Sequence, residues 1–191
     1  ENLEPKDVLV LGAGAFTLGA DDEYNHYDFV DIDENLKDIA EKHILKRPIG
    51  ENKTFHPMPA RAFLNETDKQ YDLIVLDAYS GAITIPEHMI TVEFFRTVKA
   101  KLKPDGKVIA NMAVSPSFLT SISQRVDNTM RAVFPHMSRH VIHEEYTLWD
   151  DDEANLGNVM YIYRKHDDED RSTIYTDVKN SSFIDRPRHR P

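Results

Sequence analysis

Short apolar runs alternate along the chain with stretches of helix length in which apolar residues recur every three or four positions. The clearest run is 8–11, four apolar residues that stop at a glycine. An uninterrupted apolar run is typical of a strand buried on both faces, as in the middle of a parallel sheet. The other predicted strands are 27–30, a weak one around Phe55, 72–76, 107–110, 138–142 and 158–163.

Helical spacing fills three of the gaps between these strands. The pattern predicts helices over 34–45 with Asp33 as N-cap, over 91–102 with Thr91 as N-cap, and from about 117 to 134. No helical pattern separates the last two strands, so these predict an antiparallel pair. The order of elements therefore predicts an α/β fold with a doubly wound, mostly parallel sheet.

Composition and charge narrow the classes of function. The chain has 191 residues with 23 Lys and Arg against 33 Asp and Glu, a net charge of −10. This charge disfavours binding to nucleic acid and attracts cationic small molecules such as amines. The absence of cysteine excludes disulfides and thiolate metal sites. His136, His140 and His143 do not share a strand face, so no metal is expected.

The ends of the chain carry predictions about organisation and location. Residues 1–164 are predicted to form one domain, followed by a charged tail over 165–191. No apolar run approaches the length of a membrane helix and no signal peptide is visible, so a cytoplasmic protein is expected. The chain opens without methionine close to its first strand, and we expect that an upstream segment is missing.

Candidate site residues follow three of the predicted strands, where α/β sheets bind ligands. The first is the bend Gly12-Ala13-Gly14, whose glycines permit close approach of a ligand. A helix expected to start near Phe16 would add free N–H groups. Gly19 comes too late to complete a dinucleotide fingerprint, which disfavours a nicotinamide oxidoreductase, and a plain tight turn remains the alternative.

Two aspartates complete the candidate site. Asp31, nineteen residues after Gly12, can accept hydrogen bonds from both hydroxyls of a ribose, the alternative being a second helix cap. Asp77 ends the fourth strand and could orient an attacking amine and take its proton, or simply stabilise its loop. Tyr79, beside Asp77, is the candidate for lining a substrate pocket.

Several segments in this order resemble the spermidine synthase (polyamine aminopropyltransferase) family and its spermidine-synthase-like branch. They are residues 8–14, 30–33, 71–77, 93–95 and 102–106. The resemblance spans roughly residues 6–134. It implies a class I methyltransferase-type fold, a Rossmann-like sheet of seven strands, that binds S-adenosylmethionine or its decarboxylated form.

The resemblance also assigns roles to individual positions. It places Gly12 and Gly14 around the methionine-derived part of the cofactor and Asp31 at the ribose. It makes Asp77 the catalytic aspartate, which assists loss of a proton from the attacking amine. Three positions where the family carries acids differ, since this chain has Ala15, Pro59 and Ser80 there. The predicted cofactor-binding set is Gly12, Ala13, Gly14, Asp31, Ile32, Ala60 and Asp77, and the predicted substrate-binding pair is Tyr79 and Ser80.

The function expected from these observations is transfer of an aminopropyl or methyl group from the sulfonium to an amine or polyamine. Two alternatives stay open: a non-catalytic relative that binds a nucleoside, and a small-molecule methyltransferase. Neither a nucleic acid nor a membrane is expected as partner, while the resemblance allows a homodimer.

Overall fold

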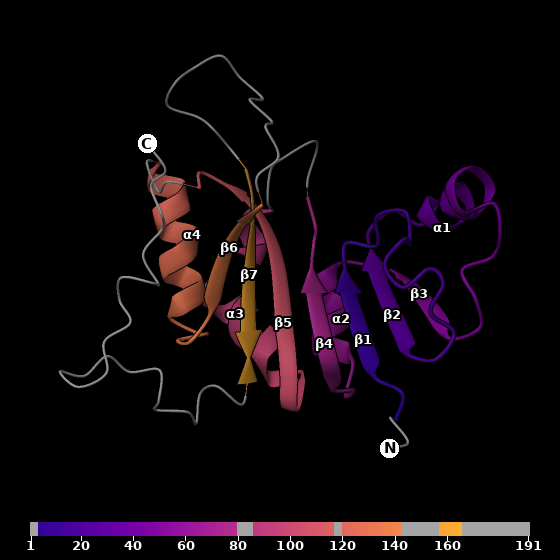
Figure 1. Ribbon diagram of the computed structural model, residues 1–191, viewed down its shortest axis with the longest axis horizontal. Helices are drawn as coiled ribbons and strands as arrows, with labels where there is room; N and C mark the ends of the chain where they lie inside the picture. Colours follow the sequence, from indigo (N-terminus) through magenta and orange to yellow (C-terminus); the bar gives the residue numbers. More distant parts are fainter. Residues whose placement is uncertain (1–3, 80–85, 117–119, 143–156, 166–191) are drawn as a thin grey trace, which may run out of the picture.

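The predicted strands form one sheet in the computed structural model, which describes residues 4–79, 86–116, 120–142 and 157–165. Their spatial order is β3-β2-β1-β4-β5-β7-β6 (Figure 1). The first five strands run parallel, β7 is antiparallel to β5, and β6 is antiparallel to β7. The doubly wound, mostly parallel sheet is thereby confirmed. The strands are β1 (Asp7–Leu11), β2 (His26–Asp31), β3 (Lys53–Pro57), β4 (Tyr71–Leu76), β5 (Leu102–Val114), β6 (Ser138–Ile142) and β7 (Gly157–Arg164).

Strand β1 is buried on both faces, as its apolar run predicts. Leu9 and Leu11 belong to the main core on one face of the sheet. Val8 and Val10 belong to a second cluster on the other face, with Phe16 and other residues from the β1–β2 side. Because both faces are covered, all four positions of the run 8–11 can be apolar.

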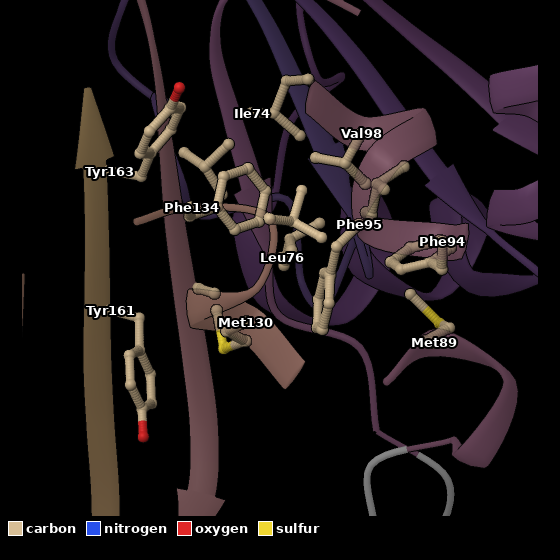
Figure 2. Packing of buried hydrophobic residues seen from close by; sticks show 14 of the residues in the cluster. Ile74, Leu76, Met89, Phe94, Phe95, Val98, Met130, Phe134, Tyr161 and Tyr163 are labelled. Carbon is tan, nitrogen blue, oxygen red and sulfur yellow. The ribbon is translucent and has the colours of Figure 1, made fainter. Parts of the chain in front are cut away.

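The main core lies between the sheet and three helices, α2 (Ala60–Glu66), α3 (Val92–Ala100) and α4 (Ser121–Arg131). Figure 2 shows its aromatic centre, where the Phe134 ring lies 4.7 Å from that of Tyr163 and 6.0 Å from that of Phe95, between ring centroids. A turn of 3-10 helix, η2 (Glu87–Met89), adds Met89 to this core. These contacts hold the helices against the sheet.

Two of the predicted helices agree with the structure in different degrees. Helix α3 begins after Thr91, whose hydroxyl accepts a hydrogen bond from Phe94 N, so the predicted cap is confirmed. Helix α4 is capped by Thr120 and ends at Arg131, shorter than predicted. The predicted start near residue 117 lies outside the described residues. Helix α2 was not predicted, because it has seven residues and no side-chain cap at Pro59.

The prediction of a regular helix capped by Asp33 is wrong. Four residues of α-helix, α1 (Leu36–Ile39), continue as π-helix, η1 (Ala40–Leu45). The N-cap is Asn35, and it makes no side-chain capping bond. The Asp33 carboxylate instead accepts hydrogen bonds from the backbone and side-chain nitrogens of Asn35. Asp33 therefore closes a turn ahead of the helix, a bond that competes with capping.

The expected helix start near Phe16 is also wrong, because the segment between β1 and β2 consists of turns. Phe16 adopts a left-handed φ of 57°, which ends any helix, and its buried ring packs on Phe29. Further along, the Asp22 carboxylate accepts hydrogen bonds from the backbone N–H groups of Tyr24 and Asn25. Side-chain bonds of this kind favour turns over helix.

The C-terminal part of the sheet ends with β7 at Arg164. Of the predicted charged tail over 165–191, residues 166–191 lie outside the described residues. Within the described part of the chain, no helix is both long and apolar enough to cross a membrane.

Candidate functional site

The carboxyl ends of β1, β2 and β4 meet where the order of the strands reverses. Strand β1 pairs with β2 on one side and with β4 on the other. Gly12, Asp31 and Asp77 each follow or end one of these three strands. The structure therefore brings the three predicted elements to one edge of the sheet, at the switch point where doubly wound folds bind ligands.

The glycine bend packs directly on the backbone of Asp77. Gly12 has a φ of 95°, and its N–H donates to the carbonyl of Val30 at 2.9 Å. A Cβ at this position would lie 2.3 Å from the carbonyl oxygen of Asp77. The Asp77 N–H in turn donates to the carbonyl of Leu11 at 2.9 Å. Glycine is therefore required at position 12 both for its backbone conformation and for the close approach of β4.

The Asp31 carboxylate turns toward the glycine bend. Its Oδ2 accepts a hydrogen bond from Ala13 N at 3.0 Å, and its Oδ1 accepts one from Asp33 N at 3.2 Å. Asp31 does not cap α1, which begins five residues later. Each oxygen retains acceptor capacity after these bonds, because an ionised carboxylate can accept about four.

The remaining predicted cofactor-binding residues lie around this pair. Gly14 is exposed, and no atom lies within 4 Å of where its Cβ would be. Ile32, directly after Asp31, is 75% exposed, which is unusual for an isoleucine beside a buried strand. Ala60 opens α2 three residues after Pro57, the register partner of Asp31. Its side chain packs against the main core, so its contact with a base stays a prediction.

Asp77 is exposed and its orientation is set by a neutral neighbour. Asn111 Nδ2 donates to Asp77 Oδ1 at 3.0 Å, and the Tyr79 hydroxyl donates to the Asn111 carbonyl at 3.0 Å. Burial, together with the charge of Asp77, raises the pKa of Tyr79 to about 12. Tyr79 is therefore an uncharged phenol near neutral pH. Ser80 lies outside the described residues.

Asn111 is a site residue that the sequence analysis missed. A single asparagine in a strand belongs to no motif. The available signal was its position: the polar residue follows the apolar run 108–110, opposite the residue after Leu76. A polar side chain within an interior strand is uncommon and indicates a candidate site residue.

Neither Asp31 nor Asp77 is paired with a cationic side chain in the part of the chain that the structure describes. Their hydrogen-bond donors are backbone N–H groups and a carboxamide. The same residues contain no cluster of three His, Asp or Glu side chains that could hold a metal ion. Within the described residues, the carboxyl edge thus presents two carboxylates without a cationic partner, Asp31 and Asp77, around the glycine bend.

The strand order and this edge define a doubly wound α/β domain of the class I methyltransferase type. Solved structures agree. The chain superposes on human methyltransferase-like protein 13 in complex with SAH with a TM-score of 0.68 and 21% identity, covering 88% of this chain and 76% of that one. A spermidine synthase in complex with the transition-state analogue AdoDATO gives 0.61 and 16%, covering 85% and 54%.

Sequence comparison identifies the family. Residues 1–144 match the family model of the spermine/spermidine synthase domain, and the chain belongs to this family. It is 32% identical over 152 residues to a polyamine aminopropyltransferase of Vibrio vulnificus, which covers 75% of this chain and 48% of that protein. The chain thus spans about half the length of this curated relative.

Proposed function

We propose that the chain forms the donor-binding and catalytic domain of an aminopropyltransferase, which takes decarboxylated S-adenosylmethionine as donor and a small-molecule amine or polyamine as acceptor. The observation that carries this proposal is the orientation of Asp31, whose carboxylate faces the glycine bend and bonds to Ala13 N at 3.0 Å. Membership of the spermine/spermidine synthase family supports it.

The nucleoside half of the donor fits the groups on the β1–β2 side of the edge. The free acceptor capacity of Asp31 suits the two hydroxyls of a ribose, which are donors. The exposed Ile32 offers an apolar surface that a base would cover. The open space above Gly14 leaves room for the chain that carries the sulfonium.

The reaction half of the proposal depends on Asp77. The donor, when bound, supplies a carbon activated by its attachment to a positive sulfur. The amine nitrogen forms a bond to this carbon while the carbon–sulfur bond breaks and its electron pair returns to sulfur, leaving a neutral thioether. Asp77 orients the amine and accepts the proton that its nitrogen loses. The neutral hydroxyl of Tyr79 helps to shape the acceptor side.

The electrostatics of the edge favour an amine acceptor. Asp77 is exposed and has no cationic partner among the described side chains, so its charge is available to an ammonium or amine. Burying an ammonium group requires such compensation. Methyl transfer and nucleoside binding without catalysis are the competing functions, and the assay below separates them. A homodimer and a cytoplasmic location stay predictions.

The test is a product assay with both forms of the donor. The chain is incubated with decarboxylated S-adenosylmethionine and a panel of diamines and polyamines, and methylthioadenosine is measured by mass spectrometry. The proposal predicts amine-dependent methylthioadenosine that is lost in Asp77→Asn. S-adenosylhomocysteine formed from the intact donor would indicate methyl transfer instead. Tight donor binding without product from either form would indicate the non-catalytic relative.

A further inference from the structure

Asn111 contacts two of the predicted active-site side chains that follow β4, those of Asp77 and Tyr79. Leu76 and Ala110 are register partners, so the next residues of the two strands, Asp77 and Asn111, lie side by side. Asn111 donates to Asp77 through its side chain and accepts from the Tyr79 hydroxyl through its backbone carbonyl. One residue of β5 therefore connects the two groups.

The orientation of the Asn111 amide follows from the charge of its neighbour. An ionised carboxylate only accepts hydrogen bonds, so the NH₂ group must face Asp77. The amide oxygen then points inward, where it is buried and has no hydrogen-bond partner among the described residues. Asn111 also lines a cavity of about 10 Å³ whose other lining residues are apolar: Leu76, Ala78, Met89, Phe94 and Met112.

A buried amide oxygen loses its hydration and requires a hydrogen-bond partner, which an apolar residue at this position would not. The amide is therefore better explained by its contact with Asp77 than by packing. A neutral donor is also suited to this place. It holds one oxygen of the carboxylate without setting a positive charge beside it, so the second oxygen can still attract an amine.

We propose that Asn111 is the positioning residue of Asp77. Its amide holds Oδ1 so that the other oxygen is directed at the acceptor amine, and its backbone holds Tyr79 alongside. This inference rests on the proposed function for its kinetic consequences, but the contact itself can be measured without any activity.

The kinetic test compares Asn111→Leu with Asn158→Leu, a matched amide removal on the neighbouring strand β7. In Asn111→Leu, kcat should fall about 10- to 100-fold because Asp77 is no longer aligned. KM for the donor should change less than about 3-fold, and the melting temperature should stay or rise, since the desolvation cost of a buried amide is removed. Asn158→Leu should change none of these. An unchanged kcat, or a fall in kcat that only parallels a fall in melting temperature, would overturn the inference.

The contact between Asn111 and Asp77 is measured independently of activity, through the side-chain NH₂ signals of Asn111 in a ¹H–¹⁵N spectrum. These signals should move in Asp77→Ala and stay in place in Asp72→Ala, which removes a carboxylate at the opposite edge. Signals that do not move in Asp77→Ala overturn the inference whatever the activity. Signals that move in a protein that transfers nothing to any amine support the contact and reject the proposed function.

Discussion

The aspartates at the two edges of the sheet have different kinds of partner. At the amino edge, Asp7, Asp28 and Asp72 are held by lysines: Lys69 bridges the first two at 2.9 and 3.0 Å, and Lys103 bridges Asp7 and Asp72 at 2.7 and 2.8 Å. At the carboxyl edge, Asp31 and Asp77 accept only from neutral N–H donors among the described residues.

The pKa values at the amino edge reflect this pairing. Burial alone would raise the pKa of Asp7 and of Asp28, but the hydrogen bonds and charges of their partners outweigh it, and both lie below the ordinary value. The pKa of Lys69 lies above its ordinary value because the same two carboxylates outweigh its burial. The carboxylates at the amino edge are thus paired with lysines of the protein. The described residues provide no such cationic partner for Asp31 and Asp77 at the carboxyl edge.

The largest effect should come from Asp77→Asn. If Asp77 orients the amine and accepts its proton, kcat should fall about 10²- to 10⁴-fold, while the affinity for methylthioadenosine changes less than about 3-fold. Product assays and calorimetry measure the two quantities. Asp72→Asn, at the amino edge, should lower the melting temperature and leave kcat unchanged. Equal kcat in wild type and Asp77→Asn would show that Asp77 does not take part in the reaction.

The next largest effect is a difference in stability between alanine substitutions of the two glycines of the bend. Gly12 and Gly14 both have left-handed φ, so alanine is strained at either position. Position 12 adds a collision with the carbonyl oxygen of Asp77. Gly14→Ala should lower the free energy of unfolding by about 1 kcal/mol, and Gly12→Ala by about 3 kcal/mol, both measured by urea denaturation. Equal losses would mean that β1 and β4 do not depend on this close approach.

A smaller effect is expected from Lys69→Met at the amino edge. Lys69 is partly exposed, so its loss should cost about 1 kcal/mol near neutral pH. The folded-state pKa of Asp7 and Asp28 lies below the unfolded value, so the unfolded chain binds more protons as the pH falls. The stabilisation is therefore present above about pH 4 and is lost as the pH falls through the lower folded values.

Urea denaturation of the wild type and of Lys69→Met at several pH values measures this loss. The difference in stability between the two proteins should shrink below about pH 4. A difference that is constant across that range would show that the lysine acts through packing rather than through the two carboxylates.

The smallest effect concerns Ile32. Because the side chain is 75% exposed, Ile32→Ser should leave the melting temperature unchanged. If a base covers this side chain, methylthioadenosine affinity should fall about 5-fold, near 1 kcal/mol of lost apolar burial. Ile122→Ser, at an exposed position on α4, is the control and should change neither quantity. An affinity unchanged by Ile32→Ser would place the base elsewhere.

Long-range arrangement was predictable where the sequence pattern had one physical cause. The run 8–11 predicts a strand buried on both faces, and the structure has it. The meeting of Gly12, Asp31 and Asp77 followed from parallel strands whose carboxyl ends share an edge. The side-chain orientation of Asp31 was a consequence of that geometry, since Ala13 N lies within its reach.

Local detail depended on competing hydrogen bonds that a linear pattern does not reveal. Asp33 is predicted to cap a helix. Its carboxylate instead accepts hydrogen bonds from the backbone and side-chain nitrogens of Asn35, only two residues along the chain. No helix forms after β1, because Phe16 has a left-handed φ and the Asp22 carboxylate stabilises a turn further along. Asn111 acquires its role only through the register of β4 and β5, which no single segment encodes.

The most direct measurement asks whether Asp31 recognises the two hydroxyls of a ribose. Calorimetry would compare methylthioadenosine with its 2′,3′-dideoxy analogue, binding to the wild type, to Asp31→Ala and to the neighbouring control Asp33→Ala. The account predicts that the wild type and Asp33→Ala prefer the full ribose by about 10- to 100-fold, and that Asp31→Ala discriminates less than about 3-fold. The same preference in all three proteins would contradict the assignment of the nucleoside to this edge of the sheet.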